Sequence, residues 1–424
     1  MSYSFDPKDD VETQWKKWLD SGLNFQDIDI EKLRERTIKD LSYVSQMDVR
    51  EYTLYQKWCE VQTKYPSAVV NDLWEGEKRV LLDEKQRRAI DDVKQNIWIP
   101  NSPEDYLDLE PELLYTSKQE DLPELWNCIR TFSSTMKNNA NIGRNLNFIV
   151  RDKITKKYLG VICISSDFLD LTPRDKYIGW DRELKTKKMI NHSAIGSTIV
   201  PLQPLGFNYV GGKLLALLCL SDTVQNMWEK LYGDKLVAIT TTSLYGKTKA
   251  GGLSQYDNLD YWQSMGFTAG SVSFEPLQDT RYMIRNWLMK NHTRKYFEWY
   301  VAKKPSGQPY KRDHKNRSLQ FVYSQMNIPK EMIRSEHARG IYWTPLYAET
   351  CEFLRGEHDG NNMKKCFESS VSDLSNIWKQ KHAKPRIKQL VKKDRVSSET
   401  LFYDDLTVLT WEQAKEKYLP QVGR

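Results

Sequence analysis

The sequence has 424 residues with a formal net charge of +6; 39% of them are hydrophobic and 28% charged. This composition predicts a globular chain of two or three domains that is long enough to bury a sizeable core. It gives no support for a membrane protein, because no apolar run approaches the roughly 20 residues that cross a bilayer.

The first ten residues, MSYSFDPKDD, contain neither the basic stretch nor the apolar stretch of a secretion signal. The six cysteines lie far apart and form no C-x-x-C pair, which argues against a disulfide framework and against a zinc site. We therefore expect a cytoplasmic protein that uses no metal.

Residues 1–110 are predicted to form a helical N-terminal extension. Apolar residues recur at steps of three and four in the stretches 11–23, 31–44 and 76–98. The pattern ends near IPNSPEDY at 99–106, where proline and serine interrupt it. These helices could recruit a protein partner or dock on the rest of the chain, and the sequence leaves both open.

Residues 111–280 are predicted to form a domain with a mixed sheet and flanking helices, an α+β fold. The long polar segment that includes TPRDKYIGWD at 172–181 is expected to be a loop. The predicted strands are 112–117, 146–152, 157–166, 193–203, 235–243 and 267–275, and the predicted helices are 121–138, 212–233 and 258–265.

Residues 281–424 are predicted to form a basic, aromatic-rich region of helix and loop. Between Arg285 and Arg317 lie ten lysines and arginines against two acids, and between Lys379 and Arg395 eight against one. Such blocks favour a surface that faces a polyanion, although a solvated basic face is an equally good interpretation. The segment 339–357 is dense in aromatic residues and is expected to be an ordered packing element.

The order of strands and helices in 111–280 resembles the GCN5-related N-acetyltransferase fold. In that fold a hairpin follows the first helix, a fourth strand runs into a pyrophosphate-binding loop, and a fifth strand comes after the next helix. The chain is also similar to the DruA family of the Druantia anti-phage system, through PRDKYIGW at 173–180, Pro201, the YG pair at 232–233 and YWQSMG at 261–266. That family in turn resembles the Mom-type phage proteins, which are acyltransferase-like and modify adenine in DNA.

The resemblance implies a DNA-modifying, acyltransferase-like protein of phage modification or anti-phage defence. Acetyl-CoA or another acyl donor would be its cofactor, and single- or double-stranded DNA its partner. The alternative is a non-catalytic nucleic-acid-binding component of a phage particle or defence system, with a degenerate acyltransferase fold. A phage-encoded protein would act in the host cytosol or be packaged in a virion.

The glycine loop between the strand 193–203 and the following helix is the candidate cofactor site. Backbone N–H groups at a helix N-terminus bind anions, and glycine permits close approach. The loop departs from the acyltransferase pattern Q/R-x-x-G-x-G/A, because Asn208 stands at the second glycine position. A tight turn without a ligand explains the glycines equally well. The candidate residues are Gln203, Gly206, Val210, Gly211, Gly212 and Lys213.

Acyl transfer to an amine requires an acceptor for the amine and an acid for the leaving thiolate. Asp175 is the candidate acceptor, and the adjacent Arg174 would lower its pKa and keep it charged. The pair could instead only hold the loop in place. His192, just before a strand, is a candidate proton relay, although most histidines in such places are surface residues.

The candidate acids for the thiolate are tyrosines that follow the strand 235–243. Tyr256 and Tyr261 flank the predicted helix 258–265, and Tyr245 lies at the end of the strand. Trp262 stands where the acyltransferase pattern often has the acid tyrosine. The sequence does not choose among the three.

The candidate nucleic-acid contacts come from the first basic block, in which cations are interleaved with aromatic rings. Lysine and arginine neutralise phosphates, and exposed rings stack on bases. Several rings of the block could instead be core residues. The candidate contacts are Arg294, Lys295, Trp299, Lys303, Lys304 and Arg312.

Overall fold

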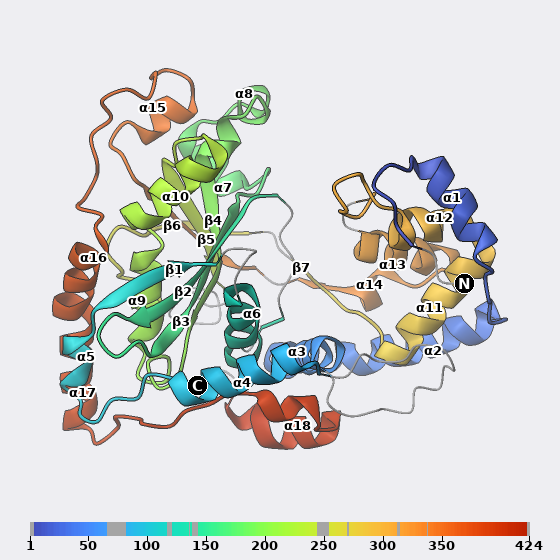
Figure 1. Ribbon diagram of the computed structural model, residues 1–424, viewed down its shortest axis with the longest axis horizontal. Helices are drawn as coiled ribbons and strands as arrows, with labels where there is room; N and C mark the ends of the chain where they lie inside the picture. Colours follow the sequence, from blue (N-terminus) through green and yellow to red (C-terminus); the bar gives the residue numbers. More distant parts are fainter. Residues whose placement is uncertain are drawn as a thin grey trace. The chain divides into compact units, whose positions relative to one another are not determined.

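The structure, a computed structural model, describes residues 4–65, 82–116, 121–134, 136–137, 143–243, 254–268, 271–311, 314–336 and 338–421 (Figure 1). The chain forms two compact units, each assembled from segments that are distant in the sequence. The helical unit takes its described residues from Met1–Tyr52 and Ser271–Glu336, and the sheet unit from Thr53–Val69, Arg79–Gly270 and His337–Arg424. The division at 1–110, 111–280 and 281–424 follows composition and stays a prediction.

The helical unit has a small aromatic core in which Trp18 and Phe297 are buried. Asp10 and Asp29 begin its first two helices by accepting hydrogen bonds from backbone N–H groups in the first turn, as an N-cap residue does. Its elements are α1 (Val11–Asp20), α2 (Ile30–Ser45), β7 (Ser271–Ser273), α11 (Gln278–Asn291), α12 (Thr293–Tyr296), η2 (Phe297–Val301), α13 (His314–Gln325), α14 (Lys330–Ile333) and β8 (Arg334–Glu336).

The sheet unit contains a seven-stranded mixed sheet in the order β1-β2-β3-β4-β5-β9-β6. Only β4 and β5 run parallel, and every other neighbouring pair is antiparallel. The mixed sheet with flanking helices confirms the predicted α+β class. The strands are β1 (Pro111–Tyr115), β2 (Asn145–Asp152), β3 (Tyr158–Ser166), β4 (Ser193–Pro201), β5 (Ala238–Ser243), β6 (Gln263–Phe267) and β9 (Gly340–Pro345).

The parallel strands β4 and β5 part after a short contact. Ser193, Ala194 and Ile195 pair with Ala238, Ile239 and Thr240, and β4 then runs on to Pro201 without further pairing to β5. In the same region the register of β3 with β4 shifts, so that Ser197 is the extra residue of a β-bulge. A bulge increases local twist, which turns β4 away from its neighbour.

Strand β9 lies between β5 and β6, although about a hundred residues separate it from β5 in the sequence. The prediction of helix and loop throughout 281–424 is therefore wrong at 340–345, and it is also wrong at the short strand β8, 334–336. The aromatic segment that contains this strand is ordered, as expected. Strand β9 has a neighbouring strand on each side, and the rings of Tyr256 and Tyr177 pack against its Tyr342 and Trp343, so these two residues are almost fully buried.

Helices cover both faces of the sheet. Helix α9 (Gly211–Leu218) packs on β3 and β4, and Leu146, Phe148 and Val150 of β2 belong to the same apolar cluster as its buried residues. Helix α6 (Leu122–Ser133) also contacts β2 and β3, and its Trp126 indole donates to the carbonyl of Ile162. The buried residues of α6 do not belong to that cluster, and α6 lies on the other face of the sheet (Figure 1).

The predicted helix 212–233 is two helices, α9 and α10, because the chain turns at Leu220 and Ser221 opens a new helix with extended backbone. The predicted helix 258–265 is also wrong: Asn258 and Tyr261 have positive φ angles, which interrupt a helix. Strand β6 occupies the end of that segment. The predicted strand 267–275 is divided, since β6 ends at Phe267 and β7 belongs to the helical unit.

The remaining helices of the sheet unit surround the sheet. Helix α3 is additional to the three predicted near the N-terminus, while α1, α2 and α4 confirm them in part, residues 76–81 lying outside the described residues. No helix in the described part of the chain is long and apolar enough to cross a membrane. The helices are α3 (Val49–Lys64, which begins in the helical unit), α4 (Glu84–Asn96), α5 (Asp105–Asp108), α6 (Leu122–Ser133), α7 (Thr172–Ile178), α8 (Arg182–Thr186), η1 (Met189–His192), α9 (Gly211–Leu218), α10 (Asp222–Tyr232), α15 (Thr350–Leu354), α16 (Val371–Ile377), η3 (Trp378–Ala383), α17 (Lys384–Lys392), η4 (Asp404–Thr407), α18 (Trp411–Tyr418) and η5 (Leu419–Gln421).

Candidate functional site

The candidate site lies where β4 and β5 part. Asp167, in the segment between β3 and α7, joins the two strands over the short stretch where they pair. Its Oδ2 accepts a hydrogen bond from the Ser193 hydroxyl of β4 and one of 2.8 Å from the Thr240 hydroxyl of β5. One buried carboxylate thus binds the first paired residue of β4 and the last paired residue of β5.

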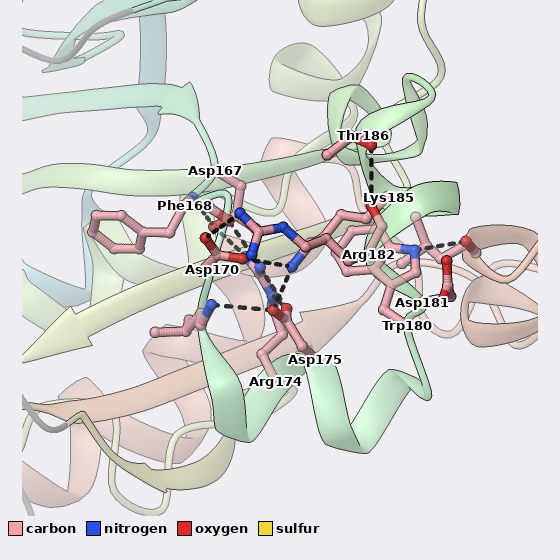
Figure 2. Close-up of polar contacts among 12 residues, drawn as sticks. Asp167, Phe168, Asp170, Arg174, Asp175, Trp180, Asp181, Arg182, Lys185 and Thr186 are labelled. Carbon is pink, nitrogen blue, oxygen red and sulfur yellow. Dashed lines mark hydrogen bonds and ion pairs between the residues drawn. The ribbon is translucent and has the colours of Figure 1, made fainter.

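Arg174 connects this carboxylate to helix α7. Its guanidinium lies 2.7 Å from Asp167 Oδ1, and neither side chain is exposed to solvent. It also donates to the Phe168 carbonyl at 2.8 Å and lies over the ring of Trp180. Figure 2 shows Arg174 between Asp167 and Asp175. A buried charge requires partners of opposite charge such as these, because burial without them costs several kcal/mol.

Asp175, the candidate acceptor for an amine, is held by two cations. Arg174 donates to its Oδ1 at 2.6 Å and Lys185 to its Oδ2 at 2.7 Å (Figure 2). Burial alone would raise the pKa of Asp175, but these hydrogen bonds and the charge of Arg174 outweigh burial and hold the pKa below its ordinary value. The expectation that the residue sits in a loop is wrong, since 172–178 forms α7. The carboxylate is therefore charged and a weak base.

His192, the candidate relay, lies at the start of β4. Its Nδ1 is 2.8 Å from the Lys235 carbonyl, just before β5, and its ring meets Phe353 edge-on. Asp234, which lies 3.8 Å from its Nε2, is bound more closely by Arg144. These contacts tie the beginnings of the two strands together. They give His192 a structural role that requires no part in proton transfer.

The first half of the glycine loop is closed upon itself. Gln203 turns its side chain back and accepts a hydrogen bond from the Phe207 N–H at 2.6 Å. The same side chain lies against Gly206, where an added Cβ would be 2.9 Å from it. Gln203 and Gly206 therefore contact each other within the loop, and these contacts fix the path of the chain before α9.

Two of the predicted anion donors are used inside the loop. The N–H groups of Val210 and Gly211 both donate to the Leu205 carbonyl. At Gly211 a Cβ would be 2.6 Å from the Cβ of Pro201 and 2.8 Å from that of Leu205, so this glycine is required by packing. The tight-turn interpretation holds for these two positions.

The next two backbone N–H groups at the N-terminus of α9 differ from those of Val210 and Gly211. In the described part of the chain, the N–H groups of Gly212 and Lys213 have no backbone acceptor, as is usual in the first turn of a helix. A Cβ at Gly212 would be 1.8 Å from the side-chain oxygen of Gln255, so a neutral oxygen lies where an anion would approach. Burial lowers the pKa of Lys213, although the charges of Asp260 and Asp257 oppose this.

Tyr256 lies beside this tip and is almost fully buried. Its ring packs against Trp262 and against Tyr342 of β9. Burial raises its pKa, against the opposing effect of hydrogen bonding to the side chains of Thr241 and Gln255. Its hydroxyl therefore keeps its proton at neutral pH, next to the first residue of β5 beyond the paired segment.

Tyr261 is placed differently. Its ring stacks on Phe367 at 3.9 Å between centroids, and its backbone has a positive φ angle. Burial raises its pKa. The neighbouring Asp260 is bound by Lys381 and His382, so this segment is anchored to the C-terminal helices. Tyr245 lies outside the described residues.

The candidate nucleic-acid contacts all belong to the helical unit. Arg294 is bound by Glu12 and Glu298 and lies over the ring of Trp15. Lys295 is exposed and lies over Phe321, which packs edge-on against Trp299. The backbones of Lys303 and Lys304 are bound within the unit, to Gln14 and Gln308. Arg312 lies outside the described residues.

Three residues near the divergence were not predicted from the sequence: Asp167, Ser197 and Thr241. Thr241 is buried and donates to the Gly196 carbonyl across the point of divergence. Ser197 bonds Ser165 of β3 at 2.8 Å. A lone aspartate or hydroxyl in a strand carries no motif, so only the sheet register brings these residues to one place.

Comparison with known proteins assigns the chain to a family. The model of the family described as Druantia protein DruA matches residues 75–356. A curated protein of that name from Escherichia coli (strain UMEA 4076-1) is 30% identical over 143 residues, which cover 31% of this chain and 35% of the relative. The chain thus spans about a third of the length of this relative. No solved structure matches the chain significantly.

Proposed function

This chain belongs to the DruA family, and from that premise we propose that it is a component of a Druantia anti-phage system that modifies DNA by acyl transfer. The proposal joins the family to the chemistry that the sheet unit can support. The acyltransferase-like fold, the acyl donor, the DNA substrate and the further likeness to Mom-type proteins are all parts of this proposal.

The observation that carries the proposal is the parting of β4 and β5 beside the tip of α9. Beyond Ile195 and Thr240 each strand has an edge that the other does not pair. Strand edges present N–H and C=O groups, and an extended chain with amides of its own can pair with them. The chain order of the hairpin β2–β3, the strand β4, the glycine loop, α9 and β5 supports the proposal, because it follows the succession described above for the acyltransferase fold.

An acyl-CoA donor fits the residues present in part. Its extended amide-bearing arm suits the strand edges, and its phosphates suit the N–H groups of Gly212 and Lys213 with the ammonium of Lys213 nearby. Gln255 would have to swing away from Gly212, which a side chain on a turn can do. The donor, when bound, supplies an activated thioester.

The chain's own residues would then hold and move protons. Tyr256 is the group best placed to give a proton to a leaving thiolate, since its hydroxyl is protonated and lies beside Thr241. The amine nitrogen would form the new amide bond as the C–S bond of the thioester breaks, and the proton that the amine loses would restore the Tyr256 hydroxyl. Asp175 is charged and can accept a hydrogen bond from an amine, but its two cations make it a positioning group and a poor base.

The proposal is tested by donor binding and by product. We expect acetyl-CoA to raise the melting temperature of the protein, and Gly212→Glu to abolish that shift by placing a carboxylate at the tip of α9. Asn226→Glu, exposed on α10, adds the same charge and is expected to keep the shift. Mass spectrometry of nucleosides from cells that express the chain should then show an acylated base. Unchanged melting with all three proteins and unmodified nucleosides would contradict the proposal.

A second candidate function is a nucleic-acid-binding component without catalysis. Two observations favour it: the Gln255 oxygen lies against Gly212, and Asp175 is bound by two cations. In that case donor binding and base modification would both be absent while DNA binding persists.

A further inference from the structure

The C-terminal helices of the sheet unit form one continuous rod, α16–η3–α17, from Val371 to Lys392. Its apolar side is part of the main core, through Trp378, Ile387 and Leu390. The π-helical turn η3 precedes Pro385, which lacks an N–H and would clash with a carbonyl one turn earlier in a regular α-helix. The rod is thus fixed on the unit by one side.

The opposite side of α17 carries a row of lysines. Lys384, Lys388 and Lys392 recur at every fourth residue, which places them along one face about 6 Å apart. All three are exposed, and none has a carboxylate partner in the described part of the chain. Between Lys379 and Arg395 the only acid is Asp394. The row is therefore a line of uncompensated positive charge on a rigid element.

An exposed ring lies against another side of α17, at Arg386, which stands two residues from Lys384 and from Lys388. Arg386 lies over the ring of Tyr209 at 5.0 Å and donates to the Asn208 carbonyl. Tyr209 belongs to the loop before α9 and is 55% exposed, with a positive φ angle that holds it at the surface. A tyrosine presented in this way offers a flat face on which a base can stack.

The basic block of the helical unit contrasts with this row. There Lys290 pairs with Asp27, Arg294 with Glu12 and Glu298, and Lys311 with Glu298. These cations stabilise the unit's own helices and would have to leave carboxylates to meet phosphates. Charge complementarity thus favours the lysines of α17 over these three cations of the block.

From these observations we propose that the exposed face of α17, with Arg386 and Tyr209, is a DNA-binding surface that holds the phosphate backbone beside the tip of α9. The inference rests on the proposed function, because it names where the DNA of that function binds. Each lysine can meet a separate phosphate, since duplex DNA carries one charge per about 1.7 Å of its axis. Trp378 fixes the rod to the loop by donating to the Val210 carbonyl at 2.9 Å.

The test measures binding of fluorescent duplex and single-stranded DNA across a salt series. The variant Lys384→Gln/Lys388→Gln/Lys392→Gln should bind at least about tenfold more weakly. Its slope of log affinity against log salt should fall by about 2.7 for duplex and about 2.1 for single strands. The matched control Lys176→Gln/Lys187→Gln/Lys230→Gln loses the same charge on exposed lysines of α7, α10 and the end of α8, away from α17 (Figure 1), and should bind like the unchanged chain.

Tyr209 distinguishes the two forms of DNA. Tyr209→Ala should weaken single-strand binding about tenfold and duplex binding little, whereas Tyr209→Phe, which keeps the ring, should bind both normally. Equal losses of DNA affinity in the lysine triple variant and in its control would overturn the inference about α17 and leave the proposed function standing. No binding by the unchanged chain would also remove DNA from the proposed function. Binding to anionic phospholipid vesicles without binding to DNA would assign the row to lipid and overturn the inference.

Discussion

Asp167 and Arg174 form an ion pair of 2.7 Å in which both side chains are shielded from solvent. Asp167 also accepts hydrogen bonds from β4 and β5, so the pair links helix α7 to the two parallel strands. Arg174 of PRDKYIGW is thus connected, through Asp167, to the stretch in which β4 and β5 pair.

The first prediction concerns this pair. Asp167→Ala should lower the free energy of unfolding by about 3–5 kcal/mol, because it leaves the Arg174 charge buried with one partner fewer. Asp170→Ala removes a carboxylate of the same segment whose side chain is 61% exposed, and should change stability by less than about 1 kcal/mol. Urea unfolding curves compare the two. Equal losses of unfolding free energy in the two variants would mean that the buried Asp167–Arg174 pair stabilises the fold no more than an exposed ion pair does.

The second prediction concerns acid stability. The pKa of Asp175 in the folded protein lies below its ordinary value of 3.8, because Lys185 and Arg174 outweigh the effect of burial. An unfolded chain therefore binds this proton first as pH falls. The stabilisation is fully present above about pH 3.8 and is lost as pH falls through the folded-state pKa.

Asp175→Asn removes this dependence. Its stability deficit relative to the unchanged chain should be largest near pH 6 and should shrink as pH falls toward 3, as measured by thermal unfolding. A stability deficit that stays constant over this pH range would show that the charge of Asp175 does not contribute to stability and that only the packing of its side chain does.

The third prediction concerns Lys57, which is buried on α3 with its Nζ 3.5 Å from Glu60. Burial lowers the pKa of Lys57 to about 7, against the attraction of Glu60. Above pH 7 the folded state has lost this proton while the unfolded state keeps it, up to its ordinary pKa of 10.5. The penalty for burying the charge is therefore complete below pH 7 and declines as pH rises.

Lys57→Met should remove this penalty. The stability gained by the substitution should be greatest at pH 6 and should fall by more than about 1 kcal/mol between pH 6 and pH 9 in urea titrations. Lys64→Met removes the other lysine bound to Glu60, whose side chain is 47% exposed, and should show no such trend. A parallel trend in both variants would point to Glu60 as the source.

The fourth prediction separates the two adjacent glycines. Gly211→Ala should cost about 1–3 kcal/mol, because its Cβ would overlap the Cβ atoms of Pro201 and Leu205. Gly212→Ala meets only the end of the flexible Gln255 side chain and improves helix propensity, so its stability should be close to unchanged. Thermal unfolding measures both. The reverse order would show that the loop does not adopt this packing.

The fifth prediction separates the two tyrosines. Tyr256→Phe keeps the ring among Trp262 and Tyr342 but removes the proton, and should lower the acyl-transfer rate at least about hundredfold with little loss of stability. Tyr261→Phe keeps the stack on Phe367 and should leave the rate unchanged. Single-turnover rates measured across a pH series decide between them. An unaffected Tyr256→Phe would remove this residue from the proton transfer.

The hairpin of β2 and β3, the strand β4 with its glycine loop, and β5 could all be predicted, because their signals are local. Alternating apolar residues mark the strands, and Gly211 marks the turn that packing requires. The helix predicted at 258–265 fails because two left-handed residues, Asn258 and Tyr261, break a pattern that looks helical. Their conformations are stabilised by neighbours such as Phe367, which the local sequence does not contain.

The candidate site was predicted in part for the same reason. Arg174 and Asp175 are adjacent in the sequence, so their ion pair could be predicted from it. Asp167 becomes important only because folding brings Ser193 and Thr240 to its two sides.

By itself the sequence determined the class of fold, the hairpin and the basic character of the C-terminal region, since periodicity and charge are properties of short segments. The tertiary structure alone decided three things: β9 lies between β5 and β6, Asp167 binds both parallel strands, and three lysines of α17 stay without carboxylate partners among the described residues while Lys290, Arg294 and Lys311 of the helical unit find them. Each depends on contacts between residues tens to hundreds of positions apart, and no local pattern encodes which distant partner a strand or a charge will meet.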